Sequence, residues 1–447
     1  LNSDISINGP VSVYADNIDM NGNIAIAGAD KNIVMKASGY IFLTNGFDLT
    51  TNGGDISLWS NTVNTTTGAE NNEVDLRGNN TLSSNGGDII LAGGLDDGSN
   101  GGTASDGIAD GYAYRGYNDS IFAADFGGGV ILNSSSATNG GDIIIRGSGY
   151  GEGVKSIGNL KIDSGTGTIT IDGKSTLGHG IEFKGDAIAI TTENTTSDAI
   201  NITGVATDTN AGKYGVVLGS GNFANGNTLI QATGANGGIT ISGTSSNSIG
   251  LYGRDKGTLQ VLAESGDITL KGQNLAGSTG SADAGFRNGN GSNNDLFYLG
   301  SRKDTAVVNG VTPIVTDSSS NIKLQADYLS WDTNEPVINT TGTFTLESVS
   351  DSFSTSQKAK TSWFTFTNIG GLTIGKSTNV QNVTVNEDLA VAGDVNLFGK
   401  VDNGEVLLTS SISIWNRHKA RCCKYYPIRV NIIYLIGIRA NKHMMNK

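Results

Sequence analysis

The amino-acid sequence predicts an all-β protein in which residues 1–410 form one right-handed parallel β-helix. A short motif of glycines, an Asp or Asn and an apolar strand recurs along those residues. Within each copy, apolar and polar residues alternate. The composition is also unusual, because the 447 residues include 65 glycines, only 4 prolines and 16% charged residues. These observations favour a thin, repetitive core over two or three globular domains.

The repeat is clearest in NGGDIILAGG, which begins at Asn85. Close copies begin at Asn52 and Asn139, and weaker copies begin at Asn236 and Glu264. Most copies are separated by about 22 to 33 residues, a typical repeat length for a solenoid. Two separations are about twice as long, from Asp88 to Asp142 and from Asp267 to Asn321, and each is interpreted as two turns. Roughly 15 coils stacked at about 4.8 Å predict a rod about 70 Å long.

Each copy of the repeat has the pattern of a half-buried strand. In TGTITIDG, Ile169 and Ile171 face one way, whereas Thr170 and Asp172 face the other. Gly and Asn suit the corners between strands because they adopt positive φ at low cost. The Asp or Asn before each strand is expected to hydrogen-bond its own turn. Stacking of such coils buries a common apolar spine that one coil alone cannot bury.

Charge and cysteine content divide the chain at residue 410. Residues 1–410 contain 21 basic and 42 acidic residues, whereas residues 411–447 contain 8 basic and no acidic residues. An acidic body argues against nucleic-acid binding. No apolar run approaches the roughly 18 residues of a membrane span. Both cysteines, Cys422 and Cys423, lie after residue 410, so the body has no disulfide framework and no cysteine metal site.

The basic tail, residues 411–447, departs from the repeat in the middle of a coil. We expect it to be a frameshift or misassembled continuation that is disordered and lies outside the fold. The alternative is a basic anchor that binds acidic surfaces.

The repeated NGGDI units in a Gly-, Asn- and Thr-rich acidic chain resemble the filamentous haemagglutinin-like adhesins. The resemblance covers most of residues 1–410. It implies a β-helical protein of Gram-negative bacteria that is secreted or held at the outer-membrane surface, and that is exported by an outer-membrane transporter in a two-partner system. The Asn-Pro-Asn-type motif of the family's secretion domain is absent, so the resemblance implies an internal or C-terminal segment of a longer shaft. It implies no catalytic residue and no cofactor.

Two loop insertions interrupt the rhythm, near residues 95–129 and 273–310. The first contains Tyr112, Tyr114, Tyr117 and Phe122. Exposed aromatic residues among Asn, Ser and Gly suit contact with a host glycan or protein receptor, so these four are the candidate ligand-contact residues. The alternative, which is favoured, is that the loop packs its own aromatic residues against the rod.

Several motifs suggest chemistry that their context does not support. Gly370–Ser377 fits the P-loop pattern, but it falls on a strand and no helix follows. Asp96 and Asp97 lie in a Gly/Asp-rich loop of the kind that binds calcium, yet the nine-residue register of calcium repeats is missing. His179 is the single histidine of the body and is assigned to a turn. We therefore predict no metal site, no cofactor and no catalytic residue.

The sequence favours a structural and adhesive shaft that presents loops to host or neighbouring cells. The alternative is a carbohydrate-active β-helix enzyme or a tailspike-like polysaccharide depolymerase. Such an enzyme needs acidic residues that converge on adjacent coils. The best candidate cluster is Lys161 and Asp163 with Lys184 and Asp186, whose common spacing would stack the two pairs if their coils are in register.

Overall fold

The structure, a computed structural model, describes residues 3–44, 46–66, 70–116, 124–219, 226–253, 257–277, 284–289, 295–302, 307–331, 334–354, 359–385, 388–399, 406–408 and 412–414. Within these ranges the regular structure is β-strand, apart from two single-turn 3-10 helices at Ser99–Gly101 and Thr361–Trp363. Three long sheets are built by parallel pairing along the chain. The predicted all-β parallel β-helix is therefore confirmed.

Sheet B contributes one strand to every coil. Its main path is β2 (Val11–Ala15), β5 (Ile33–Ala37), β8 (Ile56–Ser60), β12 (Ile89–Gly93), β16 (Ile143–Gly149), β19 (Ile169–Ser175), β22 (Ile200–Ala206), β25 (Ile239–Ser245), β28 (Ile268–Asn274), β31 (Ile322–Ala326), β34 (Thr343–Glu347), β37 (Gly371–Ile374) and β40 (Val395–Leu397). Two short strands, β9 (Asn71–Asn72) and β13 (Ala113–Arg115), extend this sheet off its main path.

Sheet C follows sheet B in the first ten coils. Its strands are β3 (Ile18–Met20), β6 (Ile41–Thr44), β10 (Val74–Arg77), β14 (Ala124–Gly127), β17 (Val154–Ser156), β20 (Ile181–Phe183), β23 (Val216–Leu218), β26 (Leu251–Gly253), β29 (Phe286–Asn288) and β32 (Leu329–Trp331).

Sheet A completes the coil. Its strands are β1 (Ile5–Ile7), β4 (Ile24–Ala29), β7 (Leu49–Asn52), β11 (Thr81–Ser83), β15 (Gly129–Asn133), β18 (Asn159–Asp163), β21 (Ala187–Thr192), β24 (Gly226–Ala232), β27 (Gly257–Ala263), β30 (Asp295–Gly300), β33 (Val337–Asn339) and β36 (Thr365–Thr367).

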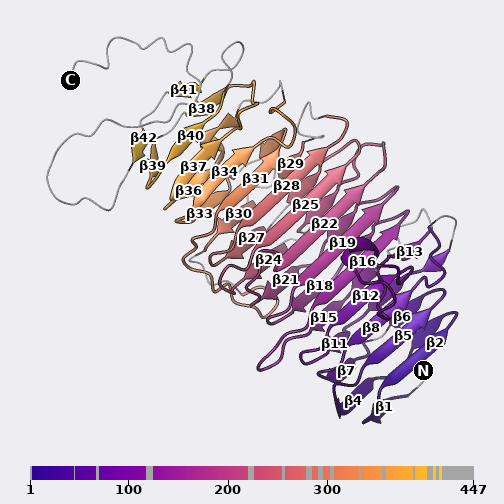
Figure 1. The fold of residues 1–447 in the computed structure, drawn as a ribbon. Coiled ribbons are helices and arrows are strands. Elements are labelled where there is room, and N and C mark those ends of the chain that lie inside the picture. The colour runs from indigo at the N-terminus through magenta and orange to yellow at the C-terminus, as the bar shows by residue number, and fades with distance from the viewer. Residues whose placement is uncertain are drawn as a thin grey trace, which may run out of the picture.

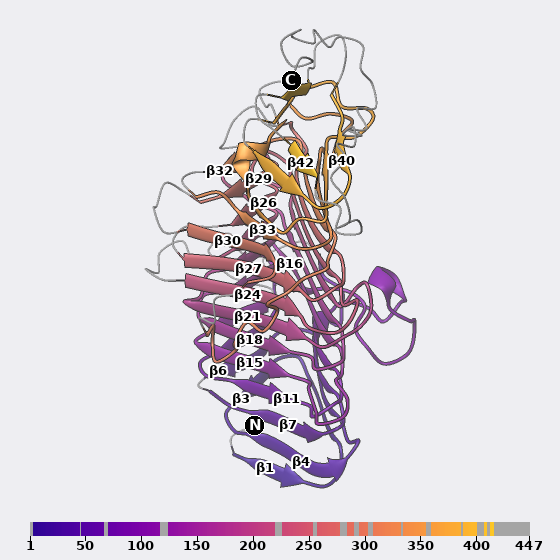
Figure 2. The same ribbon diagram turned by 90° about the vertical axis from the view of Figure 1, so that its left-hand side faces the viewer.

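The last coils divide into smaller sheets. One contains β35 (Ala359–Lys360), β38 (Val383–Val385) and β41 (Val406–Leu408). The other contains β39 (Leu389–Val391) and β42 (Ile412–Ile414). Figure 1 shows the strands stacked in chain order from the indigo N-terminus to the yellow C-terminal strands. In the view turned by 90°, a purple loop with one helical turn stands off one side of the stack (Figure 2).

The two long separations between copies of the repeat are each one coil, so their interpretation as two turns is wrong. Ile89 of β12 pairs directly with Ile143 of β16, and Ile268 of β28 pairs directly with Ile322 of β31. The extra residues leave the rod as loops instead of adding a rung. The expected insertions also contain regular rungs, because β14 lies within residues 95–129 and both β29 and β30 lie within residues 273–310.

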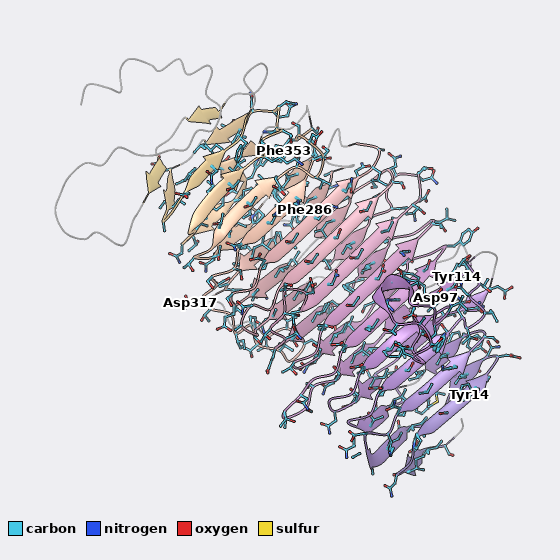
Figure 3. All side chains as sticks on the ribbon, in the orientation of Figure 1. Tyr14, Asp97, Tyr114, Phe286, Asp317 and Phe353 are labelled. Atoms are coloured by element: carbon cyan, nitrogen blue, oxygen red, sulfur yellow. The ribbon has the colours of Figure 1, made fainter. Side chains whose placement is uncertain are left out.

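One apolar core runs along the whole rod. A single cluster of buried side chains extends from Val11 to Leu397. Its members alternate along each strand, as Ile169 and Ile171 do in β19, where both are fully buried. Figure 3 shows Phe286 within the stack and Tyr14 at its margin. This continuous spine explains why each coil is stable only beside its neighbours.

The Asp and Asn residues before the strands join neighbouring coils, which differs from the expected bond within their own turn. Asp55 Oδ1 accepts a hydrogen bond from the Asp88 backbone N–H at 2.9 Å, and Asp88 Oδ1 accepts one from the Asp142 N–H at 2.7 Å. Asp142 Oδ1 accepts one from the Thr168 N–H at 2.7 Å. The side chains thus continue the backbone ladder around a corner, where strand pairing has stopped.

The second glycine of the NGGD motif stacks on its equivalent in the next coil. A Cβ atom on Gly141 would lie 2.0 Å from the carbonyl oxygen of Gly87, and one on Gly167 would lie 2.0 Å from that of Gly141. Only glycine permits this approach. The turn also needs left-handed backbone, since Asn85 and Gly86 have φ of 52° and 109°. The repeated motif is therefore a packing requirement of the corner.

Within the described residues, no helix is long and apolar enough to cross a membrane. Of the basic tail, the structure describes only the backbone of strand β42. This strand pairs in parallel with β39, so the stacking of strands continues past residue 410. The rest of residues 411–447 lies outside the described residues.

Candidate functional site

The corner between sheets B and C is a tightly packed bend of the rod. A Cβ atom on Gly173 would lie 2.1 Å from the carbonyl oxygen of Gly180, and one on Gly243 would lie 2.0 Å from that of Gly250. These glycines bring the end of each sheet B strand against the start of the next sheet C strand. Side chains at the corner are consequently held close to those of the adjacent coil.

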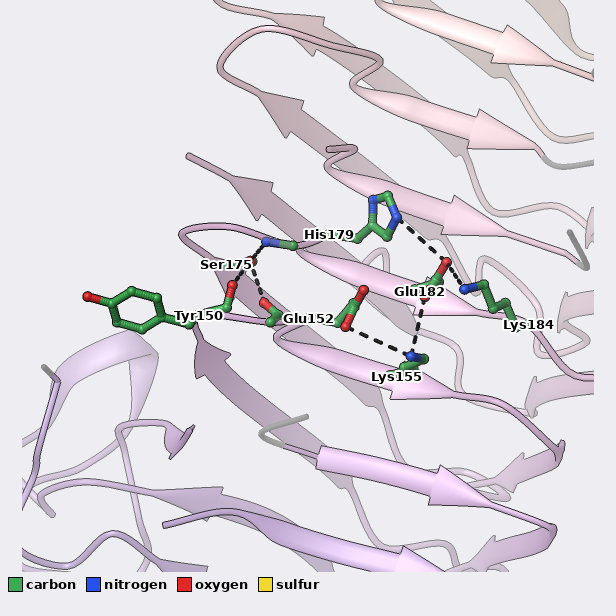
Figure 4. Close-up of polar contacts among 9 residues, drawn as sticks. Tyr150, Glu152, Lys155, Ser175, His179, Glu182 and Lys184 are labelled. Carbon is green, nitrogen blue, oxygen red and sulfur yellow. Dashed lines mark hydrogen bonds and ion pairs between the residues drawn. The ribbon is translucent and has the colours of Figure 1, made fainter. Parts of the chain in front are cut away.

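Five ionisable side chains gather at this corner in two consecutive coils: Glu152, Lys155, His179, Glu182 and Lys184 (Figure 4). We call this group the corner cluster. Lys155 of β17 and Glu182 of β20 are paired in register. Because the flanking residues of β20 face the core, the Glu182 side chain points outwards into the corner.

Glu182 is the centre of the corner cluster and its side chain is fully buried. Its Oε1 atom lies 2.8 Å from Lys184 Nζ and 3.6 Å from His179 Nε2, and its Oε2 atom lies 3.8 Å from Lys155 Nζ. Lys155 Nζ also lies 3.9 Å from Glu152 Oε2. Two carboxylates and two ammonium groups therefore balance each other in charge.

The hydrogen bonds of His179 fix the tautomer of its ring. The backbone N–H of Tyr214, in the next coil, donates to His179 Nδ1 at 2.9 Å. An accepting Nδ1 leaves the ring proton on Nε2, which faces Glu182. The Tyr214 ring stacks on the imidazole at a centroid distance of 4.9 Å. His179 thus joins its own coil to the one that follows.

Opposing effects act on the Glu182 carboxyl group. Burial alone raises its pKa, but the polar Nε2–H of His179 and the positive charges of Lys184 and Lys155 outweigh burial. The pKa of Glu182 is therefore held below its usual range. Glu182 is the anion around which the cations of the corner cluster are arranged.

The corner cluster contains a set of metal-ligand types, but the set does not suit a metal ion. One ligand atom each of Glu152, His179 and Glu182 lies within 4.8 Å of the others. A metal-binding imidazole normally donates through its second nitrogen, whereas His179 accepts there. Lys155 and Lys184 already supply positive charge to the carboxylates. The arrangement is that of a buried network of ion pairs and hydrogen bonds that joins neighbouring coils.

The sequence placed His179 in a turn, where it lies, but missed the two carboxylates beside it. The signal was the spacing between Lys155 and Glu182, which equals one coil. Spacing alone could not reveal that the turn residues Glu152 and His179 fold onto the same corner, because the turns differ in length.

The candidate ligand-contact residues of the first insertion are only partly described. The hydroxyl group of Tyr112 donates to Asp172, its ring lies 4.1 Å from Lys174 Nζ, and Tyr114 is only 4% exposed. Tyr117 and Phe122 lie outside the described residues. For Tyr112 and Tyr114 the contacts favour the alternative, in which the loop packs its aromatic residues against the rod.

The acidic residues of the same loop bind its own backbone. Asp96 accepts hydrogen bonds from the N–H groups of Asp106 and Gly107 at 3.2 and 2.8 Å, and Asp97 accepts one from Ser99 at 3.0 Å. These bonds shape the turns of the loop and give each carboxylate a role that requires no calcium ion.

The candidate catalytic pairs are not stacked. Lys161 and Asp163 lie in β18 of sheet A, where they pair with Ala189 and Thr191. Lys184 and Asp186 lie between β20 of sheet C and β21 of sheet A, and Lys184 contacts Glu182 of the corner cluster. The spacing between the two pairs is shorter than the coil at this point, so the expected convergence is wrong. Gly371–Ile374 of the P-loop-like motif forms strand β37 and is followed by a turn, as predicted.

A groove lies at the corner between sheets A and B, beside the second insertion. Its volume is about 570 Å³, and its walls include Glu193, Thr233 and Glu264 on the rod and residues 314–317, which lie after the insertion and before β31. Glu193 directly follows β21 and Glu264 directly follows β27, so the two acids occupy equivalent positions two coils apart. Asp317, at the edge of the stack in Figure 3, also lines it.

Comparisons with protein-family models, with curated proteins and with solved structures found no match to this chain. The geometry of the rod, the corner cluster and the groove is therefore the basis for the functional proposal.

Proposed function

We propose that the chain is a structural and adhesive shaft of a large bacterial protein, secreted or held at the outer-membrane surface. In this proposal the rod is exported through an outer-membrane transporter, and its inserted loops contact a host glycan or a protein receptor. The resemblance to filamentous haemagglutinin-like adhesins and the solenoid architecture support this role.

The observation that carries the proposal is that both insertions present exposed apolar side chains. Leu95 in the first insertion, and Leu275 and Val307 in the second, are 44%, 61% and 57% exposed. Loops that leave a rigid scaffold and carry accessible apolar groups are suited to recognition. The rod itself supplies spacing and rigidity through its continuous core.

The proposal predicts that binding depends on the insertions. We expect the full chain to bind epithelial cell monolayers, and we expect a variant with Leu95→Ser, Leu275→Ser and Val307→Ser to bind at least about tenfold more weakly, the effect of losing roughly 1.4 kcal/mol. Because the three side chains are exposed, thermal unfolding should be nearly unchanged. Fluorescence of labelled protein on the cells measures binding.

A matched control places the same type of change away from the insertions. Tyr14→Ser and Ile157→Ser alter side chains that are 68% and 44% exposed on the rod, and this control should retain binding. Absence of binding by the unmodified chain, or equal losses in the two variants, would contradict an adhesive role for the insertions.

The groove favours a second candidate function, a carbohydrate-active enzyme. Glu193 and Glu264 are separated by two rungs, or about 9.6 Å at the rung level. This is close to the roughly 6.5–9.5 Å between the carboxyl groups of inverting glycosidases. The segment before β31 is fixed beside them, since Val308 and Val315 pack on Leu229 and Leu262.

The enzyme candidate has its own test. Incubation of the full chain with acidic polysaccharides should release reducing ends, and Glu193→Gln with Glu264→Gln should abolish that release. Asp163→Asn with Asp186→Asn is the control and should leave it unchanged, because those two acids are at different corners. If the unmodified chain releases no reducing ends, or if the groove variant retains activity, this candidate is excluded for the substrates tested.

A further inference from the structure

A second buried charged group lies where the first insertion returns to the rod. Glu73 directly precedes β10, and Asp75 lies within it; both are almost fully buried, at 0% and 1% exposed. Their neighbours Val74 and Leu76 face the core, so the two carboxyl groups share the outer face of sheet C. Neither is part of the corner cluster.

Arginines from two directions contact this pair. Arg115 of β13, in the first insertion, places Nη1 at 2.5 Å from Glu73 Oε1. Arg77, on the same strand as Asp75, places Nη2 at 2.9 Å from Asp75 Oδ2. The other carboxylate oxygens, Glu73 Oε2 and Asp75 Oδ1, are buried and accept no hydrogen bond from the described part of the chain. The insertion therefore contacts this pair through the ion pair of Arg115 with Glu73, and each acid keeps one buried oxygen without a hydrogen bond.

Two further ionisable residues lie beside the pair. Tyr40 precedes β6, whose first residue donates its backbone N–H to the Glu73 carbonyl oxygen at 2.9 Å. On the other side, Asp125 of β14 pairs in register with Asp75, and its side chain lies outside the described residues.

We propose that Glu73 and Asp75 form a proton-controlled latch, which holds the returning strand of the first insertion (residues 113–116) against the rod at acidic pH and loosens it as the pH rises through neutrality. The strand is well placed for this role. It is short: it pairs with three residues of β16 and two of β9, and two further backbone hydrogen bonds join Gly116 to Glu70 and Tyr150 to Arg115.

The direction follows from the cost of burying a carboxylate. Burial, opposed by Arg115, raises the pKa of Glu73 to about 7, and burial, opposed by Arg77, raises that of Asp75 to about 6. A docked state with raised carboxyl pKa values binds more protons than an undocked state. Docking is therefore favoured at low pH and weakens until the pH has passed the docked pKa values.

Hydrogen exchange of the full chain, corrected for the intrinsic rate at each pH, tests the latch. With an undocked pKa of 4.5 and a docked pKa of about 7, protection of residues 113–116 should be on the order of 50-fold greater at pH 5 than at pH 8. Glu73→Gln, which resembles the protonated acid, should retain high protection at pH 8 and lose most of the pH dependence. Adding Asp75→Asn to Glu73→Gln should reduce the remaining pH dependence of protection further.

Glu70→Gln is the matched control, because Glu70 is an exposed acid just before the pair in the sequence, and it should leave the pH dependence intact. Equal protection at the two pH values, or greater protection at pH 8, would overturn the proposal and leave an ordinary ion pair. An unchanged pH dependence in Glu73→Gln would also overturn it. Protection of the core strand β19 reports in each case that the rod remains folded.

Discussion

Replacement of Gly141 by alanine is expected to destabilise the neighbouring coils by about 3 kcal/mol or more. The added Cβ would lie 2.0 Å from the Gly87 carbonyl oxygen and 2.2 Å from its carbonyl carbon. Both are backbone atoms, so no side chain can move aside, and overpacking of this kind typically costs about 1–3 kcal/mol and sometimes more. Separating the coils would also strain the hydrogen bond from the Ile89 N–H to the Asp142 carbonyl oxygen. Urea denaturation measures the loss.

Gly9→Ala is the control for this prediction. A Cβ atom at Gly9 has no other atom within 4 Å, so its stability should change by less than about 0.5 kcal/mol. In a solenoid the damage should also be local. Hydrogen exchange should rise in β12 and β16 of the Gly141 variant, and similar midpoints for the two variants would contradict stacking of the motif glycines.

Glu182→Gln is expected to cost about 2–4 kcal/mol, because it removes the anion at the centre of the corner cluster. The change takes a carboxylate away from Lys155, whose side chain is 8% exposed, and leaves Glu152 at the longer distance of 3.9 Å. Breaking one side of a buried ion pair commonly costs about 3–5 kcal/mol, and the lower range allows Lys184, which is 26% exposed, to turn towards solvent. Chemical denaturation at pH 7 measures the change.

The pH dependence of that difference has a defined sign. The folded state lowers the pKa of Glu182, so its stabilising effect is present above the ordinary carboxyl pKa and is lost as the pH falls through the folded value. The difference in unfolding free energy between the original protein and Glu182→Gln should become smaller below about pH 4.5. Lys155→Met combined with Glu182→Leu should recover much of the loss, because a well-packed apolar pair can replace a buried ion pair. A difference in unfolding free energy between the original protein and Glu182→Gln that grows in acid would contradict the lowered pKa of Glu182.

The fold was predictable because its signals are local. Alternation in segments such as Ile169–Ser175 sets a strand, and glycine with asparagine sets a corner, so stacking follows from the repeat. The coil count was not predictable from spacing. A coil can lengthen freely by extruding a loop, and the separation between Ile89 and Ile143 looks like two repeats until the pairing is known.

The candidate site was less predictable than the fold. His179 was recognised as a turn residue, but the corner cluster depends on which turns meet across coils. The Tyr214 N–H that donates to His179 Nδ1 belongs to the following coil, and no local pattern marks this bond. Likewise, Asp55, Asp88 and Asp142 look like turn residues, and only the stacking shows that each accepts a bond from the next coil.

The most direct test of the central claim, one rung per coil regardless of coil length, is a set of distances between spin labels on the outer face of sheet B. With both native cysteines replaced by serine, one label is placed at Thr170 and the second in turn at Lys323, Thr345 or Thr373, which are four, five and six rungs away. At about 4.8 Å per rung, the account predicts distances of about 19, 24 and 29 Å. Distances about one rung longer for all three pairs would show that the long step before Lys323 is two coils, and distances without a constant increment would contradict a continuous β-helix.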